Sequence, residues 1–159
     1  ILYRLVGSEM CIRDSSKSLV ELEQLKDKAR TVQRGNGNLM DDASYKSKVG
    51  ELEIDLLATE FTELRSLASA AAGGEPGPES SILKLKGTEI KQRIQKLTVE
   101  ASGIYASAWG DKGAGPSFAK GGTAGYLNSR YFTIYGGASE VQKDIVAKKV
   151  LGLTSSKSK

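Results

Sequence analysis

The longest periodic run of apolar residues lies between positions 42 and 72 and calls for an unusually long helix. Its members recur at intervals of three or four residues, which places them on one stripe of an α-helix. They are Val49, Leu52, Leu56, Leu57, Phe61, Leu64 and Ala68. At 1.5 Å per residue this helix would be about 45 Å long. Such a length suits a helical bundle better than a small mixed domain.

Two further helices are predicted around this one. The first covers about residues 18–34 and ends in a glycine-containing segment at 35–42. The GGEPGP segment at 73–78 stops the second helix, because two prolines and three glycines cannot continue it. Their apolar positions are Leu19, Leu22, Leu25, Ala29 and Val32 in the first helix and Ile82, Leu85, Ile90, Ile94, Leu97, Ala101 and Ile104 in the third. Short connections favour antiparallel neighbours, and no segment alternates long enough to be a strand, so we expect an all-α antiparallel helical bundle.

The C-terminal part is predicted to be less regular. Residues 109–123 contain five glycines and one proline, which indicates a loop that serves as a surface lid or a spacer. A short helix around 124–134, a break at Gly136 and Gly137, and a last helix from Ser139 to about Leu151 follow. We expect the bundle to cover 17–153 and the Ser/Lys-rich residues 154–159 to be a disordered tail.

The first 16 residues are predicted to be a non-native or disordered lead-in. They show neither a sustained apolar run nor a small-residue cleavage pattern, so they do not resemble a targeting peptide. The string VGSEMCIRDS resembles a translated sequencing adapter, and we therefore expect the natural sequence to begin near Ser16. A genuine, partly helical lead-in is the alternative.

Composition removes several kinds of chemistry. The chain has no histidine and one cysteine, Cys11, which excludes imidazole and thiolate metal sites, Ser/His/Asp triads and intrachain disulfides. The net charge of +4 is too small to argue for nucleic-acid binding. No apolar run approaches the roughly 18 residues of a membrane helix, so we expect a cytoplasmic protein without a membrane span. Its chemistry must use carboxylates, hydroxyls, amines or a bound cofactor.

The start of the last helix carries a motif with a physical function. Ser139 and Gln142 have the spacing of a capping box, in which the serine accepts from a free helix amide and the glutamine reaches back. Gly136 and Gly137 permit a tight turn before it. The positive end of the helix dipole would then face a carbonyl, a phosphate or an electron-rich heterocycle. On its own, such a turn is usually an ordinary helix connection.

The segment 128–153, NSRYFTIYGGASEVQKDIVAKKVLGL, closely resembles the end of acyl-CoA dehydrogenases. That family closes with an Arg, an Ile-Tyr/Phe, a glycine turn, a Thr/Ser-x-x-Gln helix start and Ile-Ala-Lys/Arg-x-x-Leu-Gly. LEIDL at 52–56, TELR at 62–65 and PESSILKLKGTE at 78–89 resemble the second and third long helices of the family's C-terminal bundle. The resemblance covers about 17–153.

The resemblance implies FAD as cofactor and an acyl-CoA as substrate. Gly137 would contact the acyl-CoA, and Tyr135, next to the turn, would share in that pocket. The residues bordering the flavin would be Ala138, Ser139, Glu140 and Val141. Ala138 stands where Thr or Ser is common in the family and Glu140 where Gln or Asn is common. The implied partners are an electron-transferring flavoprotein and further subunits in a homo-oligomer or hetero-oligomer that assembles through the helical domain.

The resemblance also raises a difficulty about the catalytic base. In several branches of the family a catalytic Glu follows the tyrosine of this turn, and Gly136 holds that position here. Either the base lies on a helix upstream of Ser16, which we favour, or the chain is a non-catalytic subunit of a heteromeric enzyme. The family's N-terminal helical and middle β-domains are absent, so we expect a fragment that does not complete the reaction alone. An acyl-CoA oxidase stays open as well.

Charged side chains elsewhere are assigned to solvated faces. The acidic set is Glu51, Glu53, Asp55, Glu60 and Glu63, and the basic set is Lys84, Lys86, Lys91, Arg93 and Lys96. Arg130 is expected to pair with a carboxylate within the bundle. The aromatic residues 126–135 are expected to pack in the core.

Overall fold

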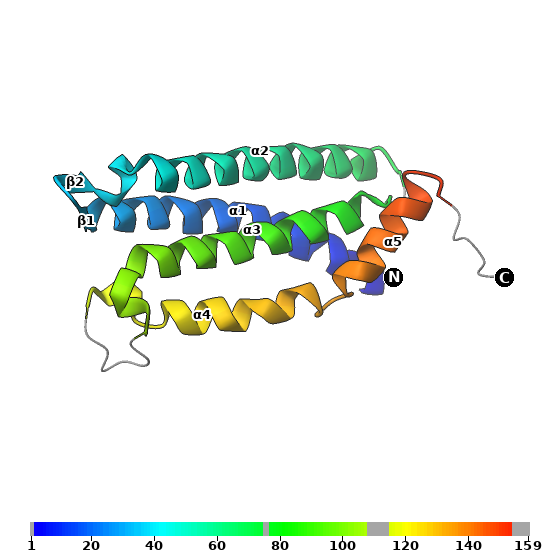
Figure 1. Cartoon of the computed structure of the whole chain (residues 1–159). Coiled ribbons are helices and arrows are strands. Elements are labelled where there is room, and N and C mark those ends of the chain that lie inside the picture. The colour runs from blue at the N-terminus through cyan, green and yellow to red at the C-terminus, as the bar shows by residue number, and fades with distance from the viewer. Residues whose placement is uncertain (1, 75–76, 108–114, 154–159) are drawn as a thin grey trace.

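The computed structural model describes residues 2–74, 77–107 and 115–153, with side chains from Ser15 onward. Five α-helices occupy the described ranges: α1 Leu2–Thr31, α2 Ala43–Ala71, α3 Glu79–Ser102, α4 Gly122–Asn128 and α5 Ser139–Lys149. Short 3-10 helices lie at η1 Leu39–Asp41, η2 Gly103–Ser107, η3 Ser117–Ala119 and η4 Ser129–Thr133. α1, α2 and α3 lie side by side, with α2 antiparallel to both of the others, α4 lies along α3, and α5 crosses one end of the bundle (Figure 1). The predicted all-α bundle is confirmed.

The boundaries of α2 lie close to the predicted ones, and α3 begins directly after the predicted break but ends at Ser102, so that Ile104 falls in η2. α1 differs from its prediction. Its helix begins at Leu2 instead of near Ser18, and it ends at Thr31. The backbone is therefore helical from Leu2 onward, as in the alternative of a partly helical lead-in, and not disordered. Whether residues 1–16 belong to the natural sequence stays a prediction. The lid or spacer expected at 109–123 falls partly on 108–114, which lie outside the described residues, while η3 and the start of α4 occupy the rest.

The segment between α1 and α2 is a small hairpin that was expected to be a plain loop. β1 (Gln33–Arg34) pairs antiparallel with β2 (Gly37–Asn38), and Gly35 takes the positive φ of +59° that the turn needs. The backbone N–H of Met40 donates to Asn38 Oδ1 at 2.8 Å, and that of Asn38 donates to Asp41 Oδ2 at 2.9 Å. This capping box fixes the path of the chain into α2.

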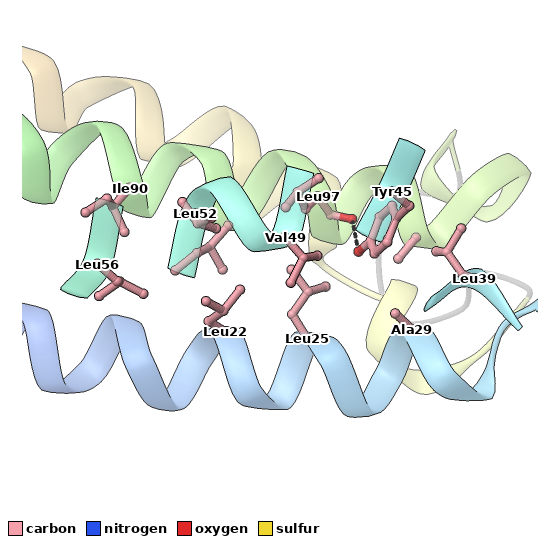
Figure 2. Packing of buried hydrophobic residues seen from close by; sticks show 12 residues of the cluster. Leu22, Leu25, Ala29, Leu39, Tyr45, Val49, Leu52, Leu56, Ile90 and Leu97 are labelled. Carbon is pink, nitrogen blue, oxygen red and sulfur yellow. Dashed lines mark hydrogen bonds between the residues drawn. The ribbon is translucent and has the colours of Figure 1, made fainter. Parts of the chain in front are cut away.

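The core lies along the seam where α1, α2 and α3 meet (Figure 2). Its members are Leu22, Leu25, Ala29, Leu39, Tyr45, Val49, Leu52, Leu56, Ile90, Ile94, Leu97 and Ala101. Tyr45 is the largest fully buried side chain, and its hydroxyl donates to Leu97 O at 3.1 Å. Burial raises the pKa of this phenol well above its usual range. One polar contact thus fixes α2 against α3 within an otherwise apolar seam.

The predicted stripe of α2 divides between two faces. Val49, Leu52 and Leu56 are buried in the seam, whereas Leu57 and Phe61 are 55% and 60% exposed. The reason is geometric, because α2 touches α1 and α3 with one side only (Figure 1).

Ion pairs between helices engage charges that were assigned to solvated faces. Arg93 binds Asp55 and also Glu51, the latter at 3.3 Å. Half-exposed pairs of this kind contribute about 0 to 1 kcal/mol each. Glu63 departs most from expectation, because it is 6% exposed and accepts a hydrogen bond from Ser15 Oγ.

Candidate functional site

The turn between η4 and α5 brings together the residues that the sequence singled out. Gly136 and Gly137 have φ angles of +67° and +107°, which residues with a Cβ rarely adopt. A Cβ built on Gly137 would lie 2.4 Å from Gln142 Nε2, whereas one built on Gly136 meets nothing within 4 Å. Position 137 therefore requires glycine for its backbone conformation, whereas the contact with the end of the flexible Gln142 side chain can be relieved by a shift of that side chain.

The predicted capping box of α5 is not formed. The residue at the N-cap is Ala138, which has no side chain able to accept a hydrogen bond. Ser139 is the first residue of the helix, and its hydroxyl donates to Thr133 O at 3.3 Å. The side chain of Gln142 lies beside Gly137. The prediction was wrong by one residue, because the serine lies inside the helix and cannot cap it.

The missing cap leaves the first amides of α5 without a side-chain acceptor. The first N–H groups of a helix point out of its end and carry the positive end of the helix dipole. Apolar side chains surround this end: Ile134, Tyr135 and Val141 are 72%, 63% and 55% exposed. A hydrogen-bond acceptor could bind the free amides at the helix end, and a flat apolar group beside it could pack against the exposed apolar side chains.

Two side chains of α3 hold η4, and with it the turn, in place. Lys84 Nζ donates to Phe132 O at 2.6 Å, and Gln92 Nε2 donates to Ser129 O at 3.0 Å. Burial lowers the pKa of the Lys84 ammonium. The sequence analysis missed both roles, since Lys84 was assigned to an exposed basic face. No local motif signals a contact between residues this far apart in the chain.

The aromatic residues near the turn pack on one another at the surface. Tyr131 lies edge-on to Tyr135 with ring centroids 6.0 Å apart. The Arg130 guanidinium lies 4.4 Å from the ring centroid of Tyr126 and donates to Ser129 Oγ at 3.0 Å. Arg130 makes no ion pair with any residue the structure describes, so the predicted carboxylate partner is wrong. Tyr131 and Tyr135 are 44% and 63% exposed and do not belong to the core.

The turn lies on the open surface and is not enclosed by a pocket. Two surface hollows, one along α4 and one between α1 and α2, lie away from it. Among the described residues no group of three His, Cys, Asp or Glu side chains is placed to hold a metal ion. No helix in the described part of the chain is long and apolar enough to cross a membrane. A ligand bound at this turn would need further protein surfaces to enclose it.

Comparison with known proteins defines the family. The model of the acyl-CoA dehydrogenase C-terminal domain matches residues 14–151. The chain therefore belongs to the acyl-CoA dehydrogenase family, whose members depend on FAD. It is 26% identical over 117 residues to acyl-CoA dehydrogenase FadE34 of Mycobacterium tuberculosis (strain ATCC 25618 / H37Rv). That match covers 74% of this chain and 15% of the relative.

Solved structures of low identity share the fold. The structure titled "PigA with FAD and proline" superposes with a TM-score of 0.74 at 16% identity, covering 91% of this chain and 36% of that one. The ChsE4-ChsE5 complex from Mycobacterium tuberculosis gives a TM-score of 0.69 at 20% identity, covering 88% and 36%. The chain thus spans about a third of these structures and a smaller share of FadE34.

Proposed function

We propose that this chain forms the C-terminal part of a flavin-dependent acyl-CoA dehydrogenase that oxidises an acyl-CoA to a trans-2-enoyl-CoA. The observation that carries the proposal is the uncapped start of α5 behind two positive-φ glycines, within a domain of this family. The turn and α5 would provide one wall of the flavin and thioester site. The remaining walls would come from the other domains of a full-length protein, so turnover by this chain alone is not expected.

The residues at the turn fit a flavin. Ala138, Ser139, Glu140 and Val141 would border the cofactor, with free helix amides toward its electron-rich edge and Val141 against its ring. Because Ala138 has no hydroxyl, contact there would be limited to the backbone and a methyl group. Glu140 lies exposed in the first turn of α5, where a carboxylate stabilises the helix dipole. FAD, when bound, would supply the acceptor for the hydride that leaves the substrate β-carbon.

The chain's own residues would position the substrate. Gly137 would let the thioester approach the backbone closely, since it has no side chain, and the exposed ring of Tyr135 would cover part of the acyl chain. Proton removal from the α-carbon needs a positioned carboxylate. Gly136 cannot supply one, so the base would come from a segment upstream of residue 16.

The proposed partners follow from the family. They are an electron-transferring flavoprotein as electron acceptor and further subunits that assemble through the helical domain. A cytoplasmic location likewise stays a prediction.

A second candidate function is a non-catalytic subunit of a heteromeric dehydrogenase. The specific observation in its favour is Gly136, which leaves the turn without a base. The structural relative described as a ChsE4-ChsE5 complex shows that a protein of this fold forms a complex of two different chains.

Flavin reduction separates these two functions. The full-length gene would be expressed, and the absorbance near about 450 nm recorded while a panel of acyl-CoAs is added without oxygen, since the flavin is the group that changes state. Bleaching by one class of acyl-CoA supports the dehydrogenase and names the substrate. A flavin-containing protein that no acyl-CoA reduces, or a flavin-free one, supports the non-catalytic subunit. Gly137→Ala is expected to weaken flavin and substrate binding, whereas Lys46→Ala, at the far end of α2, serves as the control.

A further inference from the structure

Lys84, in the second turn of α3, is a half-buried lysine without a carboxylate beside it. Burial lowers the pKa of its ammonium, and within the described residues no acidic side chain forms an ion pair with it. The next lysine of the helix differs, since Lys86 Nζ lies 3.3 Å from Glu89 Oε2. The ammonium of Lys84 donates instead to a backbone carbonyl, Phe132 O, at 2.6 Å. This hydrogen bond to η4 is therefore the contact that defines where the Lys84 side chain lies.

The last two carbonyls of η4 are held by side chains from two different helices. Phe132 O accepts from Lys84 Nζ of α3, and Thr133 O accepts from Ser139 Oγ of α5 at 3.3 Å. Residues 134–138, which contain the glycine turn, lie between these two contacts. The bond from the charged donor is the shorter and the stronger of the two. The position of the turn relative to the bundle therefore depends chiefly on Lys84.

A second lysine of α3 contacts the side chain of the same phenylalanine. Lys91 lies two helical turns after Lys84 and on the same side of α3, and its Nζ is 5.2 Å from the centroid of the Phe132 ring. Lys91 Nζ also lies 4.0 Å from Glu21 Oε1 of α1. Phe132 is thus held at its carbonyl by one lysine and at its ring by the other. Through these side chains the turn is connected to α1 as well as to α3.

The turn needs such contacts because its own residues cannot fix it. Glycine has more conformational freedom than any other residue, so Gly136 and Gly137 define one turn only if the chain on both sides is held. Under the proposed function Gly137 contacts the thioester through its backbone, so the geometry of that contact is the geometry of the backbone. Figure 1 shows α5 crossing the bundle at the end where α3 begins, which is the end where Lys84 lies. A side chain of α3 can therefore set the geometry of the candidate site without touching a ligand there.

We propose that Lys84 is a positioning residue of the candidate flavin and thioester site, acting through Phe132 O on the backbone of the turn. The proposal rests on the function proposed above and deepens it, because it names a residue outside the turn that sets where the thioester lies against the flavin. Lys91 contributes a smaller part through the ring of Phe132. Misplacing reacting groups by about 1 Å costs on the order of a hundredfold in rate. Loss of the Lys84 contact should therefore be visible in the chemical step.

The first test measures the order of the turn in this chain, without flavin or acyl-CoA. The heteronuclear NOE of the Gly136 and Gly137 amides is recorded by NMR. In Lys84→Met, which keeps the apolar stem and removes the donor, these values are expected to fall because the turn becomes mobile. Lys84→Arg keeps both the cation and the donor and should retain most of the original values. Lys86→Met is the matched control on the same helix and should leave both glycine amides unchanged.

The second test measures the chemical step in the full-length protein. The rate constant of flavin reduction is recorded at saturating acyl-CoA without oxygen and expressed per bound flavin, so a smaller folded fraction does not change it. Lys84→Met is expected to lower this rate constant about tenfold, and Lys84→Arg should recover most of it. Lys91→Met removes only the contact with the ring and should lower it less than about fivefold. Lys86→Met should leave it unchanged.

Two results would overturn the proposal. Unchanged glycine NOE values in Lys84→Met would show that Lys84 does not hold the turn, and an unchanged rate of flavin reduction would show that holding the turn has no effect on the reaction. Both results leave the dehydrogenase proposal intact. If instead no acyl-CoA reduces the unsubstituted protein, the dehydrogenase proposal fails, and the flavin dissociation constant replaces the rate as the second readout. Weaker flavin binding by Lys84→Met, restored in Lys84→Arg, would then support the positioning role, and equal binding would overturn it.

Discussion

Along the seam of α1, α2 and α3 the side chains are buried and the helix that begins there is capped, whereas the turn before α5 is exposed and uncapped. The side chain of Asp42, at the N-cap of α2, accepts from the N–H of Tyr45 at 3.0 Å, while Ala138, at the N-cap of α5, has no side chain that can accept a hydrogen bond. The apolar side chains of the seam and the free amide that begins α2 thus find their partners within the seam itself. At the turn, by contrast, the first amide donors of α5 have no side-chain acceptor and the apolar side chains are uncovered.

The two regions also differ in how they are tied to the rest of the molecule. The seam depends on apolar contact, with Leu22 and Leu52 fully buried. The turn is held through η4 by polar side chains of α3, chiefly Lys84 and Gln92. Stability and candidate function are therefore placed in different parts of the bundle, and substitutions in each should have separable effects.

The largest difference in the free energy of unfolding is expected when one apolar side chain is shortened in each region. Leu52→Ala leaves a cavity in the seam and should lower the free energy of unfolding by about 2 to 5 kcal/mol. Val141→Ala, at the exposed start of α5, should cost less than about 0.5 kcal/mol. Urea denaturation followed by circular dichroism measures both. Equal losses for the two variants would contradict the contrast between the regions.

A smaller effect is expected at the polar tether of the turn. Lys84→Met keeps the apolar stem but removes the donor to Phe132 O, and should lower the free energy of unfolding by about 1 kcal/mol. Lys86→Met is the control, because among the described side chains Lys86 pairs only with the exposed Glu89, so this substitution should change stability little. Hydrogen exchange should accelerate at residues 132–137 in the Lys84 variant. Unchanged exchange there would show that Lys84 does not hold the turn.

Much of the fold follows from the sequence, because α2 and α3 carry strong helical periodicity and end at clear breakers. The prediction of 42–72 for α2 compares with Ala43–Ala71 in the structure. Periodicity could not divide the stripe of α2 into a buried and an exposed face, since apolar residues occupy both. The hairpin after α1 was missed because two-residue strands are too short to show alternation.

The candidate site could be located from the sequence but not constructed from it. The glycine turn and the start of α5 were predicted at the right positions. The capping box was wrong because a serine three residues before a glutamine has the same spacing whether it lies at the N-cap or one residue inside the helix. The contacts of Lys84 and Gln92 join distant segments, and only the packing of η4 on α3 shows them.

Giving α5 the N-cap that it lacks should make its start resemble the capped start of α2. Ala138→Ser supplies an acceptor for a free amide and is expected to stabilise the helix by about 0.5 to 1 kcal/mol. Hydrogen exchange at the first amides of α5 should slow accordingly. Ala138→Val, which adds volume without an acceptor, is the control. If both variants slowed exchange equally, capping would not be the cause.

The smallest effect is confined to acid and concerns the cap that α2 already has. The hydrogen bond from the N–H of Tyr45 is the main cause that holds the pKa of Asp42 below its ordinary value of 3.8. A carboxyl with a lowered folded pKa stabilises the folded state above the unfolded value and loses that contribution as the pH falls through the folded value. The midpoint of thermal unfolding should therefore fall less steeply below about pH 4 in Asp42→Asn, whose amide oxygen still caps α2. Parallel pH profiles for the two proteins would show that the carboxylate charge contributes nothing to the start of α2, and that its advantage over the start of α5 lies in the hydrogen bond alone.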